Sequence, residues 1–369
     1  MKLCSAGWNC TSGFPAAAAG EARGVGGTGD GTINSPAGDI PAGGTIPAEQ
    51  PRLAAVDWGT SSFRLWLVGA GGTVLAERRA AEGMQAVPPG GFEAVLRGHL
   101  AAVGVEATDA PLPVVLCGMV GARQGWREAA YADCPADPAA LAAAALRFDL
   151  PGLDLAILPG VARRDADRPD VMRGEETQLA GLLALEPDYA GVVVLPGTHA
   201  KWATVAGGRI ADFRTVMTGE LHALLAGHSI LRHSIGDARP SGDPASPGFR
   251  AGLARGLADP AALAGEIFAL RAGDLLFARH GAEVADRLSG LLIGAEVGAM
   301  LAGVAKGAAI GLVAAGPLAG LYRAAFVAAG RPARDLDADV LVRAGLIAAA
   351  GRLWPDLAAL TPPAHNSAA

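Results

Sequence analysis

The sequence predicts a mixed α/β protein made of two similar lobes with a cleft between them. Short apolar strands alternate with helical segments along the chain, which is typical of α/β folds. One pattern occurs twice, near residues 53–79 and again at 191–215: a strand, a polar Gly-Thr turn, a second strand, a Gly-Gly hairpin and a third strand. A repeat of this length does not suit a solenoid and indicates two homologous domains, with chance similarity of two hairpins as the alternative.

The first copy of the pattern begins at Leu53. The segments LAAVD, FRLWLVG and TVLAERR predict three strands, with Gly71-Gly72 as the turn between the last two. Apolar periodicity then predicts a helix, two buried strands and a second helix. These lie at Phe92–Val103, residues 113–118, residues 155–160 and Glu175–Leu185.

The second copy is GVVVLPGTHAKWATVAGGRIADFRT, and the chain after it becomes mainly helical. A strand is expected at residues 310–316. A helix should begin at Pro317, directly after it, because proline is favourable in the first turn of a helix. The expected helices are Pro260–Ala272, Val284–Ala305, Pro317–Ala329 and Ala338–Leu353. We therefore assign residues 51–188 to the first lobe and residues 189–369 to the second.

Residues 1–50 differ in composition from the rest of the chain. They are rich in Gly, Ala, Pro, Ser and Thr and have no apolar period, which predicts a disordered extension. A wrongly assigned start codon is an alternative, since the folded pattern begins abruptly at Leu53. A functional arm is the third, and no residue supports it.

Composition limits the kind of partner. The 369 residues carry a net charge of −6 and no dense Lys/Arg stretch, which argues against a nucleic-acid partner. Four cysteines without a CxxC pair argue against a disulfide framework and favour a reduced cytoplasm. No apolar run suits a signal peptide or a membrane span. The sequence leaves a homodimer open.

The first motif that carries chemistry is DWGTSS at residues 57–62, between two strands. Gly59 allows close approach of a phosphate, and backbone N–H groups with the hydroxyls of Thr60 and Ser61 offer donors. A carboxylate beside such a nest repels phosphate unless a divalent cation intervenes, so Asp57 predicts Mg²⁺ bound through water. An Asx-type hairpin turn is the simpler alternative.

The matching turn in the second half is PGTHAKW at residues 196–202. Gly197 and Thr198 repeat the Gly-Thr pair, so two turns facing each other could hold the β- and γ-phosphates of a nucleotide. Lys201 suits either a functional or a surface position, and His199 suits a structural hydrogen bond. Gly316, at a strand-to-helix junction, could admit an adenosine ring or a phosphate, although many junctions look similar.

Two acidic residues at the start of the expected helix 175–185 are candidates for a general base. Either Glu175 or Glu176 could take the proton from an attacking hydroxyl, and ordinary helix-end electrostatics is the alternative. Adjacent helical residues project about 100° apart, so only one can face the substrate. Glu220 is the next candidate.

The segment CGMVGARQGW at residues 117–126 combines glycines with polar and aromatic side chains. Arg123 could bind a carboxylate through its bidentate fork, with Gln124 and Trp126 lining a polar pocket. Gly83 and Met84, after the third strand, could line the same pocket. A surface turn with a packing tryptophan is the alternative.

The chain resembles the 2-dehydro-3-deoxygalactonokinases in DWGTSSFRLWL, EGM, LCGMVGARQGW, DVMRGEETQLAGLL, LPGTHAKW, FRTVMTGELHALLAGHSIL and LSGLLIGAE. The resemblance runs from about Leu53 to the C-terminus. It implies a duplicated ribonuclease-H-like fold of the actin, hexokinase and Hsp70 superfamily, and an adenosine motif at Gly316. It also implies ATP-dependent phosphorylation of 2-dehydro-3-deoxygalactonate at its 6-hydroxyl. The superfamily usually has an aspartate base, so the glutamates depart from its pattern.

Two rival functions remain open from the sequence. One is a kinase of another sugar acid or of a hexose. The other is a non-catalytic nucleotide-sensing module on the same fold, since fold does not fix function. Such a module would need neither the MRGEETQ carboxylates nor the GMVGARQGW pocket, and both are present.

Overall fold

The computed structural model describes residues 49–105 and 110–361. The extension expected at residues 1–50 lies outside the described residues, apart from its last two. In the described part, the expected strands and helices form close to their predicted bounds, and Glu175–Leu185 forms a helix with those same ends. None of its helices is long and apolar enough to cross a membrane.

The first sheet has the strand order β3-β2-β1-β4-β7-β6. Its central strand β1 pairs antiparallel with β2 and parallel with β4. In this register Asp57 lies opposite Arg64 on one side and Cys117 on the other. The strands are β1 (Leu53–Trp58), β2 (Phe63–Val68), β3 (Val74–Ala80), β4 (Leu112–Cys117), β6 (Leu146–Leu150) and β7 (Leu153–Ile157).

The second sheet repeats this arrangement with the order β12-β11-β10-β13-β14. Its strand β10 pairs antiparallel with β11 and parallel with β13, as β1 does with β2 and β4. The predicted duplication is therefore confirmed, and both halves have the strand order of a ribonuclease-H-like fold. The strands are β10 (Gly191–Leu195), β11 (Ala200–Ala206), β12 (Arg209–Val216), β13 (Ala309–Val313) and β14 (Arg334–Leu336).

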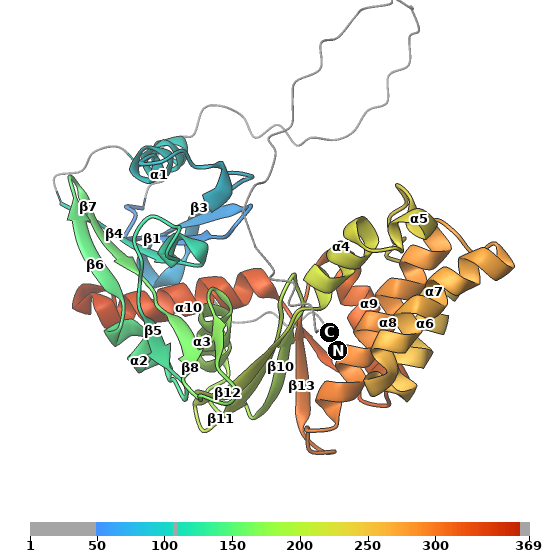
Figure 1. Cartoon of the computed structure of the whole chain (residues 1–369). Helices are drawn as coiled ribbons and strands as arrows, with labels where there is room; N and C mark the ends of the chain where they lie inside the picture. The colour runs from blue at the N-terminus through green and yellow to red at the C-terminus, as the bar shows by residue number, and fades with distance from the viewer. Residues whose placement is uncertain (1–48, 106–109, 362–369) are drawn as a thin grey trace, which may run out of the picture. The chain divides into compact units, whose positions relative to one another are not determined.

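Helices surround the two sheets, and a small third sheet joins β5 (Tyr131–Asp133), β8 (Gly160–Arg163) and β9 (Asp170–Met172). Figure 1 shows α6, α7 and α8 side by side, remote from the first sheet. Sequence patterns missed the short strands, α2, and α4 to α6. The helices are α1 (Phe92–Ala102), α2 (Pro138–Ala143), α3 (Glu175–Leu185), α4 (Thr218–His228), α5 (Arg232–Ile235), α6 (Pro247–Ala258), α7 (Leu263–Phe277), α8 (Ala282–Leu301), α9 (Gly316–Ala328) and α10 (Ala338–Leu353).

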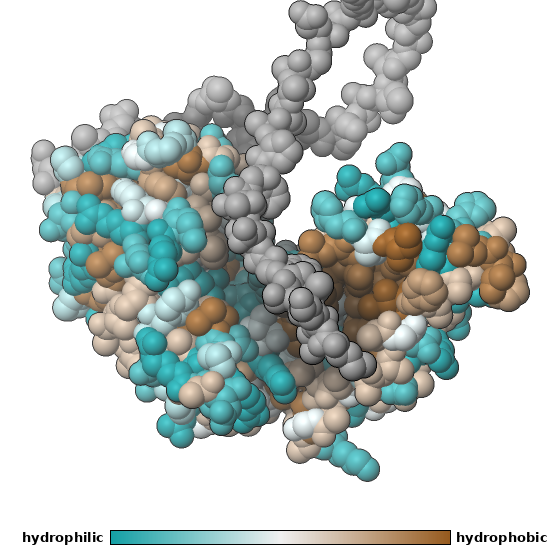
Figure 2. All heavy atoms as spheres, viewed as in Figure 1, coloured by the Kyte–Doolittle hydropathy of each residue, from teal (hydrophilic) through white to brown (hydrophobic). Residues whose placement is uncertain are grey.

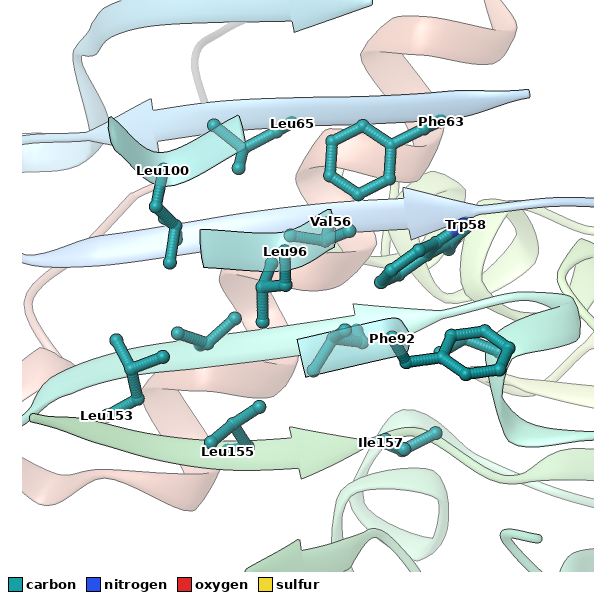
Figure 3. Packing of buried hydrophobic residues seen from close by; sticks show 14 of the residues in the cluster. Val56, Trp58, Phe63, Leu65, Phe92, Leu96, Leu100, Leu153, Leu155 and Ile157 are labelled. Carbon is teal, nitrogen blue, oxygen red and sulfur yellow. The ribbon is translucent and has the colours of Figure 1, made fainter. Parts of the chain in front are cut away.

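The first sheet is buried on both faces. On one face, alternate residues of the strands pack against α1, whose Phe92, Leu96 and Leu100 recur at intervals of four (Figure 3). On the other face, Trp66 and its neighbours pack against α10. The period of two in strands and of 3.6 in helices explains why these positions are apolar.

The chain exchanges helices between its halves. Helix α3 precedes the second copy of the pattern, yet its Leu179 and Leu182 pack in the core of the second sheet. Helix α10 follows that copy, yet its Leu346 and Ile347 pack on the first sheet. The boundary between lobes at residues 188 and 189 stays a prediction. Each sheet is covered in part by one helix from the other side of that boundary.

The two exchanged helices pack directly on each other through glycines. A Cβ atom added at Gly181 of α3 would lie 1.8 Å from the Leu341 carbonyl oxygen of α10. A Cβ added at Gly345 of α10 would lie 2.0 Å from the Thr177 carbonyl oxygen of α3. The backbones therefore touch, and no other residue type fits without separating the helices.

We expect Gly345→Ala to destabilise the protein strongly. The added methyl group must push α3 from α10, and overpacking of this kind costs roughly 1–3 kcal/mol or more. Chemical denaturation of the purified variant measures the free energy of unfolding. Gly351→Ala on the same helix is the matched control, because a Cβ there meets its nearest atom at 3.4 Å. Equal stability of the two variants would contradict the close contact.

Candidate active site

The turn between β1 and β2 is held by the segment that follows β3. Gly59 N donates to Ser62 O at 2.9 Å, which closes the turn. Met84 N donates to Gly59 O at 2.9 Å, and a Cβ added at Gly83 would lie 2.4 Å from the Ser61 backbone. Thr60 and Ser61 keep their side chains exposed. Gly83 and Met84, expected in a sugar pocket, thus lie directly behind this first loop.

Asp57 is the last residue but one of β1, beside that loop, and pairs with Arg64 on β2. Arg64 also pairs with Asp339 in the first turn of α10. Burial raises the pKa of Asp57, while the Arg64 guanidinium acts in the opposite direction. Its Oδ1 faces Gly118, where a Cβ would approach to 3.2 Å. The missing side chain of Gly118 thus lets the turn after β4 approach Asp57 and Trp58 closely. A carboxylate oxygen is the kind of ligand that Mg²⁺ prefers.

Glu175 and Glu176 lie at the start of α3 in different surroundings. Glu175 has 26% of its side chain exposed, and its Oε1 lies 3.3 Å from Lys201 Nζ. Glu176 is only 1% exposed. Its Oε2 accepts a hydrogen bond from Gly174 N at 2.7 Å, and its Oε1 accepts one from the Thr177 hydroxyl at 3.1 Å. Burial, with the nearby Glu175 charge, raises the pKa of Glu176 to about 8.

The turn between β10 and β11 supplies the second loop. Lys201 is 5% exposed, and its Nζ donates to His199 O at 3.0 Å besides pairing with Glu175. The His199 ring pairs with Glu220 of α4, in keeping with the expected structural hydrogen bond. Glu220 N also donates to Thr198 O at 3.0 Å. Lys201 is thus buried and links the second loop to the start of α3.

These contacts gather Asp57, Glu175, Glu176 and Lys201 around the two loops. A Cβ added at Gly174 would lie 3.6 Å from the Cα of Gly118, so the turn after β4 and the start of α3 adjoin. Positive charge from Lys201 and Arg64 faces the carboxylates. An array of this kind can bind phosphates at the loops and move a proton at Glu175.

The expected substrate residues lie apart from these contacts. Arg123 is 81% exposed and lies 3.5 Å from Glu128, and Gln124 is exposed as well. The Trp126 ring stacks on Phe92, with centroids 6.1 Å apart, and so belongs partly to the core. Gly316 is exposed at the start of α9 with φ at +59°. Among the described residues, none of these four forms a hydrogen bond or ion pair with Glu175 or Asp57.

Arg64 and Arg173 carry site charges that sequence reasoning did not assign. Arg64 had a detectable signal, because opposite charges face each other across the hairpin that joins Asp57 to it. Arg173 donates from Nη2 to Ala129 O at 2.8 Å and lies 4.4 Å from the Tyr131 ring centre. Among the described residues, its Nε and Nη1 have no hydrogen-bond partner. That burial has no sequence signal.

The described residues contain no group of three or more His, Cys, Asp or Glu side chains that could hold a metal ion. Any Mg²⁺ at Asp57 would thus take most of its ligands from water and from phosphate oxygens, as this ion commonly does.

The fold and the site together define a class of protein. Two ribonuclease-H-like halves, each with a Gly-Thr turn after its first strand, and carboxylates near those turns describe a two-lobed small-molecule kinase. A profile of the 2-keto-3-deoxy-galactonokinase family matches residues 57–349. The chain belongs to this family, as its resemblance predicted.

Individual relatives agree with this assignment. A protein of Rhizobium meliloti strain 1021, named as a probable 2-dehydro-3-deoxygalactonokinase, is 47% identical over 82% of this chain and 97% of its own length. The 2-dehydro-3-deoxygalactonokinase of Escherichia coli K12 is 39% identical over 80% of this chain and 96% of its own. A crystal structure from Sinorhizobium meliloti, of a candidate 2-dehydro-3-deoxygalactonokinase, superposes with a TM-score of 0.77 at 47% identity. It covers 82% of this chain and 99% of that one.

We expect Glu176 to make stability fall as pH rises through the neutral range. The folded protein keeps this proton up to about pH 8, whereas the ordinary pKa is 4.5. The group's contribution is therefore fully present below pH ~4.5 and is lost as pH rises towards ~8, at about 1.4 kcal/mol per pH unit. Denaturation at several pH values should show a steeper fall for the parent than for Glu176→Gln. Parallel stability curves would refute this titration.

Proposed function

We propose that this protein is an ATP-dependent kinase that phosphorylates 2-dehydro-3-deoxy-D-galactonate at its 6-hydroxyl group. The observation that carries the proposal is the contact between Glu175 and Lys201, at 3.3 Å. It puts a partly exposed carboxylate, suited to act as a base, next to the second Gly-Thr loop. The family to which the chain belongs supplies the reaction type.

The two loops would hold the nucleotide phosphates from opposite sides. In the first loop Gly59 would allow a phosphate to approach the backbone, and the donors would be the exposed hydroxyls of Thr60 and Ser61, because Gly59 N already donates to Ser62 O. In the second they are Gly197 and Thr198. A Cβ added at Gly197 would meet nothing within 4 Å, so the protein itself does not require glycine there. A phosphate approaching the backbone would explain it.

Asp57 would hold Mg²⁺ through water, because a carboxylate oxygen is the kind of ligand that this ion prefers. When bound, this ion neutralises charge on the phosphates during transfer. Arg64 pairs with Oδ2 of Asp57, and the Cys117 thiol also hydrogen-bonds the carboxylate. Arg64 would orient the Asp57 carboxylate, because Arg64 is itself held by its ion pair with Asp339 of α10.

Glu175 would be the general base, and Glu176 would position it. Glu176 is buried, holds a proton at neutral pH and binds Gly174 N, so it fixes the turn from which Glu175 projects. Lys201 would direct Glu175 towards the second loop through their ion pair. The proton of the sugar hydroxyl would pass to Glu175 as the hydroxyl oxygen attacks the γ-phosphorus, and ADP leaves.

The sugar acid would lie on the first-lobe side. The exposed guanidinium of Arg123, which pairs only weakly with Glu128, would bind the sugar carboxylate. Gln124, Trp126, Gly83 and Met84 would line the same pocket. Gly316 would border the adenosine. We place the reaction in the cytoplasm, in keeping with the free thiols of Cys117 and Cys134. A homodimer and the lack of a nucleic-acid partner stay predictions.

A coupled assay of ATP consumption over a panel of sugar acids and hexoses tests this function. We expect turnover with 2-dehydro-3-deoxy-D-galactonate to exceed that with every other acceptor. Faster turnover of another acceptor would identify a different sugar kinase. Nucleotide binding without turnover of any acceptor would favour the nucleotide-sensing module.

We expect Glu175→Gln to lower kcat by roughly 10²–10⁴-fold, because it removes the proton acceptor. The KM for ATP should change little. Glu176→Gln is the matched control, since it keeps the hydrogen bond to Gly174 N, and its kcat should stay within about severalfold of the parent. Steady-state kinetics of both variants decides between them. If Glu176→Gln alone loses activity, the two roles are reversed. If both keep kcat, Glu220 is the next candidate.

We expect Gly197→Ala to weaken ATP use without weakening the fold. The methyl group meets no protein atom within 4 Å, yet it would occupy the space of a phosphate. The KM for ATP should rise by about tenfold, the effect of losing one hydrogen bond to a charged group. Gly227→Ala, which also meets nothing within 4 Å, is the control. A normal KM for ATP in Gly197→Ala would contradict a phosphate at this loop.

A further inference from the structure

A buried glutamate on α8 takes no part in the chemistry above. Glu296 is 4% exposed. Its Oε1 accepts a hydrogen bond from Trp202 Nε1 at 2.8 Å, and its Oε2 accepts one from the Tyr322 hydroxyl at 2.6 Å and another from the Thr218 hydroxyl. Burying a carboxylate is costly unless it is hydrogen-bonded. A leucine at this position would avoid the free-energy cost of burying a carboxylate. The presence of the carboxylate therefore suggests a role beyond packing.

The three donors come from three separate elements that border the nucleotide side. Trp202 is in β11 and directly follows Lys201. Thr218 is the first residue of α4. Tyr322 is in α9, which begins at Gly316. One carboxylate therefore joins the strand after the second loop, the helix beside that loop and the helix at the expected adenosine turn.

Helix α4 transmits its position to the second loop by direct backbone contact. A Cβ added at Gly219 would lie 2.5 Å from the Gly197 carbonyl oxygen. Glu220 N donates to Thr198 O at 3.0 Å. A shift of Thr218 away from Glu296 must therefore move the Gly-Thr turn with it.

The helix that carries Glu296 is itself fixed. A Cβ added at Gly290 of α8 would lie 2.1 Å from the Phe249 carbonyl oxygen of α6, and one at Gly294 would lie 2.5 Å from that of Leu253. These backbone contacts allow little sliding of α8 along α6. Glu296 is thus a fixed point to which β11, α4 and α9 are tied.

We propose that Glu296 is a positioning residue for nucleotide binding, which sets the second phosphate loop and the start of α9 in register without touching the nucleotide. This inference rests on the proposed function, because it takes those two places as the nucleotide site. It predicts that loss of the carboxylate harms nucleotide binding selectively and leaves the sugar side, on the first lobe, unaffected.

The test uses Glu296→Gln and Tyr322→Phe in the full chain. Glu296→Gln removes the charge and replaces one of the two acceptor oxygens by an amide nitrogen, which cannot accept a hydrogen bond. Tyr322→Phe removes one hydrogen bond with almost no change of volume. Isothermal titration with Mg²⁺-ADP should give a Kd raised about tenfold in Glu296→Gln and about severalfold in Tyr322→Phe. The KM for ATP should rise in parallel, while the KM for the sugar acid should stay within about twofold.

Glu283→Gln is the control, because Glu283 lies on the same helix but is exposed and pairs with Arg287. A lower Tm with an unchanged Kd for ADP, measured well below that Tm, would reduce Glu296 to a stability role and overturn the proposal. If Glu296→Gln does not fold, Tyr322→Phe decides. A parent that binds ADP but phosphorylates no acceptor refutes the kinase function and leaves this test standing. A parent that binds no nucleotide overturns both.

Discussion

The contact between α3 and α10 is the constraint on which the rest of the site depends. Gly181 and Gly345 let the two backbones touch, and each helix covers the sheet of the opposite half. The start of α3 carries Glu175, and the start of α10 carries Asp339, which holds Arg64 and through it Asp57. Glu175 and Asp57, the proposed base and the proposed metal-side carboxylate, therefore share one rigid support. Atoms that must keep their separation during phosphoryl transfer benefit from such a support.

The adjacent carboxyl groups of Glu175 and Glu176 lie in different electrostatic environments. Glu176 is buried, and its raised pKa keeps the proton on it at neutral pH, since desolvation penalises the charged form. Glu175, one residue earlier, reaches Lys201 and solvent. A helix turns by about 100° per residue, so neighbouring side chains meet different surroundings without any special device. The same turn of helix thus carries one partly exposed glutamate, the proposed base, and one buried glutamate that holds the turn.

Much of the fold could be predicted from the sequence, and the site only in part. The repeated strand-turn-strand pattern gave the duplication, because strand periodicity and Gly-rich turns are local signals. Helix α4 was missed, because its apolar residues do not form one stripe and its start depends on contact with Gly197. Glu175 and Glu176 could not be told apart from the sequence, because they differ in burial, which is a tertiary property. For the same reason, the ion pair of Arg64 with Asp339, 275 residues apart, has no local trace.

Glycine has two different functions in this chain, and only three-dimensional structure separates them. At Gly181, Gly219, Gly290 and Gly345 an added Cβ would strike a backbone of the protein itself, so the missing side chain serves packing. At Gly197 an added Cβ would meet no protein atom within 4 Å, so packing does not explain the residue, whereas the proposed phosphate would. The first loop differs, since Gly59 is in contact with Ser62 of its own turn. The two copies of the motif therefore differ in how their loops are held. The first loop is held by Ser62 and the Gly83 segment, within its own half. The second loop is positioned by α4, and its glycine stays open. An open glycine beside a helix start fixed by a buried carboxylate is an arrangement in which a phosphate can complete the packing.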